Sequence, residues 1–207
     1  MPVSSSRIFI VSGPSGSGKS TLVQRLRDLP DIMFSVSSTT RPPRATESPG
    51  KCYDFISEDE FNRRVAAGEF LEYAQVFGRH WYGTPRQIVD EARRTGRDLV
   101  LEIDVQGARQ VKEKLPEAIA IFIVPPSRQD LERRLRSRGQ DSDEAIARRL
   151  ERARQEMARS VEYDFVVVND DLERASNEVL AIAVAARCRR SDNEERLRKI
   201  LETFGGS

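Results

Sequence analysis

Short apolar runs alternate with stretches of helical periodicity along most of the chain. Residues 7–12 (RIFIVS), 98–104 (DLVLEID) and 119–124 (IAIFIV) are such runs, and helical sequence follows each of them. Strands that are buried on both faces have continuous apolar sequences, and their alternation with helices is typical of a parallel sheet covered on both sides. Residues 163–168 are expected to join this sheet. The pattern therefore predicts an α/β fold.

Helices are predicted where apolar positions recur every three to four residues and capping residues mark the ends. Ser57 and Glu60 form a capping box before a helix that Gly68 ends, and Thr84 is expected to be the N-cap of a helix with Pro85 in its first turn. The other predicted helices are 20–28, 106–114, 127–138, 142–159, 172–190 and 193–203, and the other predicted strands are 32–37, 70–76 and 81–83.

The region from about residue 35 to residue 83 differs from the rest because its strands are short and its loops polar, with residues 39–52 rich in Thr, Pro, Arg and Gly. This composition indicates a lobe inserted into the parallel-sheet core.

Composition excludes several classes of protein. The 207 residues carry 34 Lys plus Arg and 33 Asp plus Glu, a net charge of +1, whereas a protein that coats nucleic acid needs a strong basic excess. The longest apolar runs, 118–124 and 179–186, are too short to cross a membrane, and no signal peptide is visible. With two distant cysteines and one histidine, the chain is predicted to be a reduced, cytoplasmic protein without a zinc site.

A phosphate-binding loop follows the first apolar strand and opens a helix. The segment 13–20 (GPSGSGKS) matches the pattern G-x-x-x-x-G-K-[ST], in which backbone N–H groups converge on phosphate. Lys19 is expected to bridge the β- and γ-phosphates of a nucleotide and the Ser20 hydroxyl to ligate Mg²⁺. The candidate ATP-binding residues are Gly13, Pro14, Ser15, Gly16, Ser17, Gly18, Lys19, Ser20 and Thr21.

Candidate groups for a phosphoryl acceptor lie in the polar region. Arg41 and Arg44 could bind one phosphate with two guanidinium forks, and Tyr53 and Tyr82 could add hydroxyl donors. Glu72 stands in an otherwise apolar strand, where a carboxylate suits the two adjacent N–H donors of guanine. From composition alone, the arginines are equally compatible with a solvated loop and Glu72 with the solvent face of an edge strand.

The motifs GPSGSGKS, FSVSSTTRPPR, EFLEYAQVFG, WYGT, LEIDVQGARQV, RLRSRGQD and YDFVVVNDD occur in this order between residues 7 and 187, and together they resemble the guanylate kinase family. The resemblance implies transfer of the ATP γ-phosphoryl group to GMP and dGMP, with Mg²⁺, in purine nucleotide metabolism and GMP recycling. It also implies one domain with a three-layer P-loop NTPase core (1–34, 84–126 and 160–207), a GMP-binding lobe (35–83) and a helical lid (127–159).

The resemblance also assigns roles to individual residues. Guanine would be bound by Ser37, Glu72, Thr84 and Asp104, and the GMP phosphate by Arg41, Arg44, Tyr53 and Tyr82. The lid arginines that reach the transferring phosphate would be Arg134, Arg138 and Arg149, and the segment near adenine would contain Asn169 and Asp170. Glu102 occupies the position of a Mg²⁺-associated acid in many P-loop folds.

Two features of the sequence complicate the assignment of the phosphate-binding residues. Thr46 replaces the glycine of the usual family pattern R-x-G-E, which affects the expected geometry at Tyr53. Asp130 lies four residues before Arg134, the spacing of an exposed helical ion pair, so resemblance alone assigns Arg134. Arg138 and Arg149 have no acid at that spacing.

Three alternative functions are compared with the sequence. A noncatalytic phosphopeptide-binding module typically has a degraded P-loop, and here the loop is complete. A kinase of the same fold acting on a phosphorylated sugar would not need Glu72. A P-loop GTPase would need the motif Asn-Lys-x-Asp, which does not occur. The oligomeric state, monomer or homo-oligomer, is left open.

Overall fold

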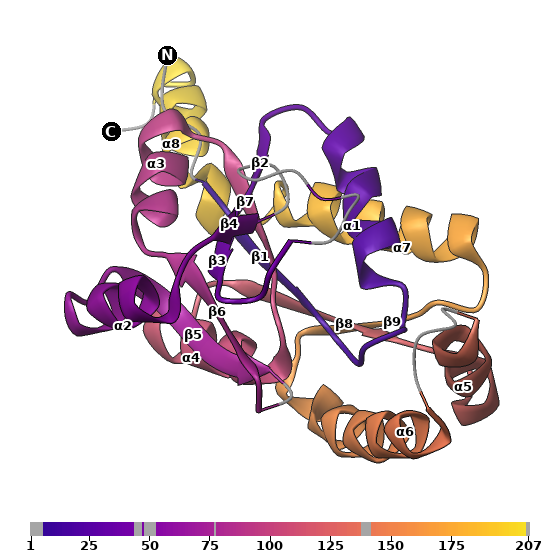
Figure 1. Ribbon diagram of the computed structural model, residues 1–207. Helices are drawn as coiled ribbons and strands as arrows, with labels where there is room; N and C mark the ends of the chain where they lie inside the picture. Colours follow the sequence, from indigo (N-terminus) through magenta and orange to yellow (C-terminus); the bar gives the residue numbers. More distant parts are fainter. Residues whose placement is uncertain (1–5, 44–46, 48–52, 77, 138–141, 206–207) are drawn as a thin grey trace.

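A five-stranded parallel sheet forms the centre of the molecule (Figure 1). The structure is a computed structural model that describes residues 6–43, 47, 53–76, 78–137 and 142–205. The strands lie in the order β2-β7-β1-β8-β9, and all neighbours are parallel. They are β1 (Ile8–Ser12), β2 (Ile32–Phe34), β7 (Asp98–Glu102), β8 (Ile119–Val124) and β9 (Phe165–Val168). The predicted parallel sheet, including its last strand, is confirmed.

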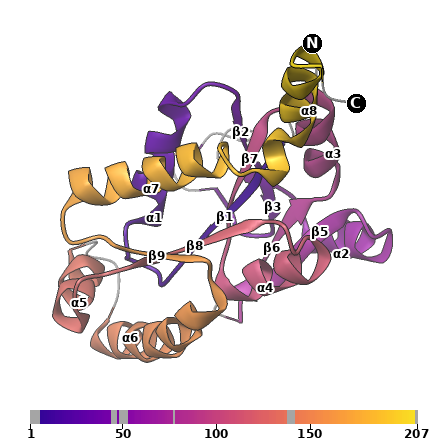
Figure 2. The ribbon, with the colours of Figure 1, turned by 180° about the vertical axis from the view of Figure 1, so that it is seen from behind.

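Helices cover both faces of this sheet because successive strand residues point to opposite sides. Phe9 and Val11 of β1 pack in a core with α1 (Lys19–Arg25), the short 3₁₀ turn Leu26–Asp28 and α7 (Leu172–Ala186). Ile8 and Ile10 pack in a second core with α3 (Gln87–Thr95) and α4 (Val105–Lys114). Figure 2 shows α7 running across the first face. Because the strands are parallel, their carboxyl ends lie along one edge of this three-layer core.

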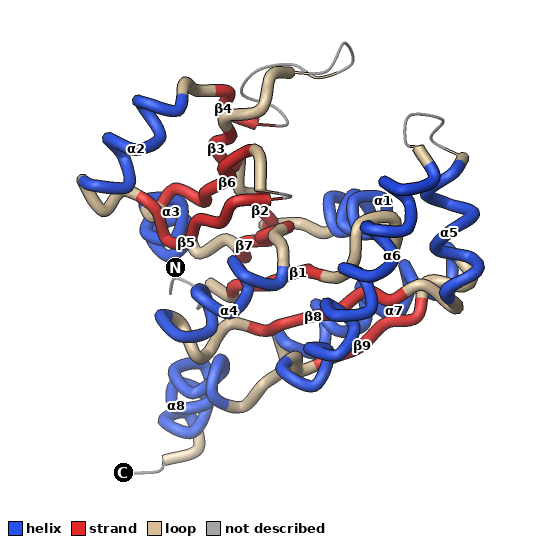
Figure 3. Tube along the Cα trace, turned by 60° about the horizontal axis from the view of Figure 1, so that its bottom comes forward, coloured by secondary structure: helices blue, strands red, loops and turns tan. Residues whose placement is uncertain are grey.

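A second, four-stranded sheet stands beside the first (Figure 3), with the order β4-β3-β6-β5. Its strands are β3 (Ser37–Thr39), β4 (Tyr53–Phe55), β5 (Phe70–Val76) and β6 (His80–Pro85). The helix α2 (Glu58–Ala66) begins at its predicted cap Ser57 and stacks Phe61 on Phe70, with ring centroids 4.6 Å apart. The strand predicted over 32–37 is in fact divided between the two sheets, and β4 was not predicted.

The predicted N-cap role of Thr84 is wrong. Thr84 belongs to β6, where it is opposite Glu72 of β5, and α3 begins only at Gln87. The Thr84 hydroxyl is buried and donates to the Glu72 carboxylate, so a tertiary partner replaces the local capping interaction.

The helical pair α5 (Arg128–Arg136) and α6 (Asp143–Met157) has a small core of its own, formed by Leu131, Leu135, Ile146, Leu150 and Ala153. Ser127 and Ser142 cap the two helices through their side chains. A 3₁₀ turn, Ala158–Glu162, leads from α6 to β9. Within the part of the chain that the structure describes, no helix combines the length and apolar composition needed to cross a membrane.

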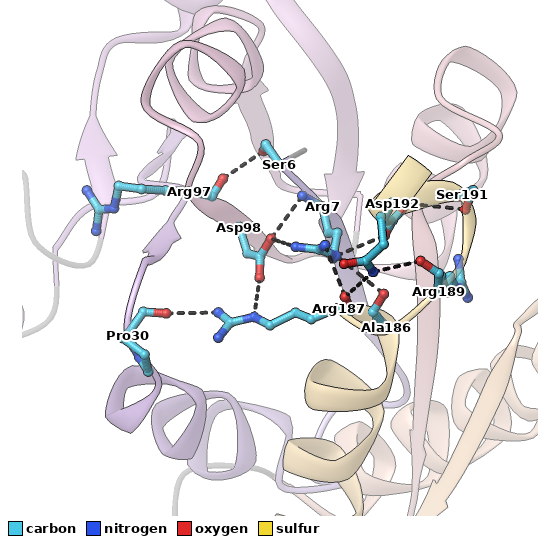
Figure 4. Close-up of polar contacts among 11 residues, drawn as sticks. Ser6, Arg7, Pro30, Arg97, Asp98, Ala186, Arg187, Arg189, Ser191 and Asp192 are labelled. Atoms are coloured by element: carbon cyan, nitrogen blue, oxygen red, sulfur yellow. Dashed lines mark hydrogen bonds and ion pairs between the residues drawn. The ribbon is translucent and has the colours of Figure 1, made fainter. Parts of the chain in front are cut away.

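A buried ion cluster attaches the C-terminal segment to the sheet (Figure 4). Asp98, which is 2% exposed, accepts from Arg7 Nη1 at 3.2 Å and from Arg187 Nε at 2.8 Å. Arg7 Nε also donates at 2.9 Å to Asp192, which lies in the 3₁₀ turn Ser191–Asn193 that precedes α8 (Glu194–Thr203). Because Asp98 holds two arginines, it stabilises both the start of β1 and the end of α7.

Replacing Asp98 with alanine should lower the free energy of unfolding by about 3–5 kcal/mol, because it removes a buried carboxylate that pairs with both Arg7 and Arg187. Urea unfolding measures this loss. Glu113→Ala, which removes the partner of the exposed Arg109 on α4, is the control and should cost less than about 1 kcal/mol. Equal, small effects of the two substitutions would contradict the role given to the cluster.

Candidate active site

The loop between β1 and α1 has positive φ angles at three glycines, Gly13, Gly16 and Gly18, which is backbone that glycine favours. Gly13 and Gly18 have φ values of 140° and 92°. A Cβ atom on Gly13 would overlap the carbonyl oxygen of Ile123 in β8, and one on Gly18 would overlap the amide of Asn169. The loop therefore lies directly against the sheet and leads into the N-terminus of α1, a position that favours anion binding.

Side chains from distant segments of the chain form hydrogen bonds with this loop. The carbonyl of the buried Ser17 accepts from Asn169 Nδ2 at 2.8 Å and from Arg134 Nη1 at 3.3 Å. Arg134 Nη2 also donates to the Asn169 carbonyl at 2.7 Å, and Arg149 Nη2 donates to Ser15 Oγ at 2.6 Å. Both helices of the α5–α6 pair thus contact the loop through an arginine.

The predicted surface pairing of Asp130 with Arg134 is not formed. Asp130 instead accepts from Ser127 Oγ at 2.6 Å and pairs with Arg133. With Asp130 held by these neighbours, Arg134 is directed to the loop.

Lys19 and Ser20 lie at the mouth of the loop. Lys19 Nζ donates to the carbonyls of Gly13 at 2.6 Å and Pro14 at 3.0 Å, and Ser20 Oγ donates to the Glu102 carboxylate at 2.6 Å. A hydroxyl and a carboxylate in contact beside a phosphate loop are the hard oxygen donors that Mg²⁺ prefers. In the described ranges no three His, Cys, Asp or Glu side chains gather into a cluster, and Mg²⁺ needs none because phosphates and water complete its shell.

A cavity of about 290 Å³ extends from the loop to the four-stranded sheet. Its lining combines predicted residues from three parts of the chain. They are Gly13, Ser15, Gly16, Gly18, Lys19, Ser20 and Thr21 of the phosphate-loop motif and the start of α1, Ser37, Tyr53, Glu72 and Tyr82 of the second sheet, Glu102 at the end of β7, and Asp104 after it. The structure therefore brings most of the predicted nucleotide residues to one space.

Glu72 is the buried acid of this cavity, with 3% of its surface exposed. Its Oε1 accepts from Thr84 Oγ1 at 2.5 Å, and Thr84 Oγ1 is 3.5 Å from Ser37 Oγ. Burial raises the pKa of Glu72 to about 7; the Thr84 hydrogen bond opposes this rise and the charge of Asp104 adds to it. Glu72 is thus not the solvent-facing edge acid that composition also allowed.

Asp104 caps α4 and faces the same cavity. Its Oδ1 accepts from the N–H groups of Gln106 and Gly107 at 3.1 and 2.9 Å. Arg152 of α6 lies 3.8 Å from Asp104 Oδ2 and donates to Glu156 at 2.9 Å, and burial raises the pKa of Glu156. Arg152 and Glu156 line the cavity but were not predicted, although Arg152 follows Arg149 by three residues and so shares its helix face.

Arg41 lies in a cluster with the two predicted tyrosines. Its Nη1 and Nη2 donate to the two Glu47 oxygens, each at 2.9 Å, and its Nε donates to Tyr82 Oη at 3.1 Å. The Glu47 hydrogen bonds raise the pKa of Arg41. The Tyr53 ring centroid is 5.5 Å from the guanidinium, and burial raises the pKa of Tyr53 to about 12.

Some predicted residues lie elsewhere. Asn169 is buried behind the phosphate loop, and the exposed Asp170 accepts from the Asp171 N–H at 2.7 Å and pairs with Arg174. Arg44, Thr46 and Arg138 lie outside the described residues.

Comparison with known proteins matches this geometry to one family. Residues 5–186 match the family model described as guanylate kinase. The chain is 49% identical over 185 residues to a guanylate kinase of Myxococcus xanthus, covering 88% of each protein, and 53% identical to one of Neisseria gonorrhoeae, covering 89% of this chain and 90% of that one. A crystal structure of guanylate kinase from Anaplasma phagocytophilum superposes with a TM-score of 0.73 at 33% identity, covering 94% and 96% of the two chains. With a complete phosphate loop and these relatives, the chain belongs to the guanylate kinase family.

Proposed function

We propose that this protein transfers the γ-phosphoryl group of ATP to GMP and to dGMP, giving ADP and GDP or dGDP. The observation that carries the proposal is the single cavity joining a complete phosphate loop to the buried Glu72 carboxylate. The names of the relatives support the same reaction. The unpaired, exposed thiol of Cys188 fits a reducing compartment, and the cytoplasm is the location we propose.

On the donor side, the phosphate loop binds the ATP phosphates through its N–H groups, and Lys19 neutralises charge on the transferring group. Ser20 and Glu102 would hold Mg²⁺, which supplies further charge stabilisation when bound. Asn169 and Asp170 are assigned to the adenine end through the family resemblance. No general base is required, because positioning and electrostatics provide most of the catalysis of phosphoryl transfer.

On the acceptor side, Glu72 and Asp104 accept from the N–H donors of guanine, with Ser37 and Thr84 beside them. Adenine does not present two adjacent N–H donors on its Watson–Crick edge, so this pair of carboxylates selects guanine. Arg41, Arg44, Tyr53 and Tyr82 bind the GMP phosphate. That phosphate competes with Glu47 for the Arg41 donors.

Arg134, Arg138 and Arg149 are the proposed charge-stabilising residues of the helical pair. Arg134 and Arg149 already contact loop residues Ser17 and Ser15. Closure of this pair over bound nucleotides would bring guanidinium groups to the transferring phosphate and exclude water, which limits ATP hydrolysis.

The proposed function is tested by a coupled assay of ADP release with ATP, Mg²⁺ and a panel of GMP, dGMP, AMP, UMP, CMP and ribose bisphosphate. We expect turnover with GMP, weaker turnover with dGMP and none with the others. Turnover with ribose bisphosphate but not GMP would favour a sugar-phosphate kinase. The absence of turnover with every acceptor would favour a binding module.

Lys19→Ala should reduce kcat by on the order of 10²–10³, as expected for loss of one charge-stabilising group. Steady-state kinetics measure this effect, and thermal unfolding checks that the variant is folded. Lys199→Ala, which removes an exposed ion pair on α8, is the matched control. Undiminished turnover in folded Lys19→Ala protein would contradict the mechanism.

The kcat/KM for GMP should fall as the pH drops through about 7, since protonated Glu72 no longer accepts two N–H donors. The slope should approach about tenfold per pH unit below the pKa of Glu72. In Glu72→Gln the value should be low and lack this component, while the KM for ATP stays near that of the parent. Because GMP's own ionisation affects both proteins, identical pH profiles would contradict the guanine role of Glu72.

A further inference from the structure

One face of α4 contacts three consecutive residues of β5. Gly107, Gln110 and Lys114 lie at positions i, i+3 and i+7, which share a side of the helix. Gly107 meets Glu72, Gln110 meets Tyr73 and Lys114 meets Leu71. Figures 1 and 2 both show α4 alongside β5, so this helix of the core joins the second sheet.

Gln110 acts on β5 as a neighbouring strand would. β5 is an edge strand of its sheet, so one side of its backbone has no strand partner. Gln110 Nε2 donates to the Tyr73 carbonyl at 2.7 Å, and Gln110 Oε1 accepts from the Tyr73 N–H at 3.2 Å. The two hydrogen bonds satisfy both backbone groups and fix the strand along the helix axis.

Lys114 secures the residue on the other side of Glu72. The pairing of β5 with β6 shifts register between Phe70 and Glu72, which leaves Leu71 at an irregular position. Lys114 Nζ donates to the Leu71 carbonyl. The backbone on both sides of Glu72 is therefore bonded to α4.

Gly107 contacts both carboxylates of the guanine site. Its N–H donates to Asp104 Oδ1 at 2.9 Å. Its missing side chain makes room for Glu72, because a Cβ atom here would lie 2.9 Å from Glu72 Cδ and would overlap Oε2. Gly107 is thus the residue that sets how closely Glu72 can approach the start of α4, where Asp104 is held.

We infer that Gly107 is a specificity-determining positioning residue, which together with Gln110 holds the Glu72 and Asp104 carboxylates at the spacing that guanine requires. This inference rests on the guanine role proposed above for these two acids. Alanine favours a helix more than glycine by about 1 kcal/mol, so helix stability gives no reason for a glycine here. Contact with Glu72 does give one.

Gly107→Ala should raise the KM for GMP by about 10- to 100-fold, since a displacement of about 1 Å in a binding group has effects of this size. The KM for ATP should stay within about twofold, and the preference for GMP over IMP, which lacks the 2-amino group, should shrink. Steady-state kinetics with both acceptors measure these values. Arg109→Ala, an exposed position on the same helix, is the control and should change none of them.

A double-substitution cycle shows whether Gly107 acts through Glu72. In a Glu72→Ala background there is no carboxylate to displace, so Gly107→Ala should cause little further rise in the KM for GMP. Multiplicative effects of the two substitutions would overturn the inference. So would an unchanged KM for GMP in Gly107→Ala when Glu72→Gln raises it, whereas an unchanged KM in Glu72→Gln itself would instead reject the guanine role.

Gln110→Met provides a second test that does not depend on the folding of Gly107→Ala. Methionine keeps the length and helix preference of the side chain but removes both hydrogen bonds with Tyr73. The KM for GMP should rise several-fold, with the KM for ATP and the thermal unfolding midpoint nearly unchanged. A lower midpoint without a change in the KM for GMP would show that Gln110 supports only the fold, and would overturn its positioning role.

Discussion

The parallel pairing of β1 with β7 is the contact on which the arrangement of the site depends. Val11 lies opposite Glu102 in the register, so the two strands end side by side. The phosphate loop leaves the first strand, and Glu102 and Asp104 end or follow the second. Ser20 then reaches Glu102 at 2.6 Å, and Asp104 caps a helix that begins beside the loop. This register thus places the phosphate loop next to Glu102 and Asp104. Binding sites in α/β sheets commonly lie at the carboxyl ends of parallel strands in this way.

The second constraint is the burial of Glu72, which carries an energetic cost. An acid that is 3% exposed loses hydration, and its raised pKa of about 7 shows that the Thr84 hydrogen bond does not fully compensate. Between its ordinary pKa and about 7 the folded state binds more protons than the unfolded state, so the stability contribution of this group falls as the pH rises. A carboxylate that is incompletely satisfied without ligand is well suited to accept N–H donors from a base.

The sequence predicted well those features that depend on neighbouring residues. The phosphate loop, its strand and its helix are local, as is the cap Ser57. The errors occurred where a distant partner replaced a local one: Thr84 bonds Glu72 in place of a helix end, and Arg134 bonds the loop in place of Asp130. Gly107 could not be predicted as a site residue for the same reason. Its neighbours in the helix do not explain a glycine, and only the fold brings Glu72 against it.

The Arg134 and Arg149 contacts also bear on how the helical pair can act. Both arginines bond loop oxygens, the Ser17 carbonyl and the Ser15 hydroxyl, so they stabilise the loop before any phosphate binds. Arg152, one turn further along α6, already spans towards Asp104 and Glu156. The three arginines therefore link α5 and α6 to the donor loop and to the acceptor acids at once. In the proposed reaction, a movement of this pair would therefore change the surroundings of the donor loop and of Asp104 together.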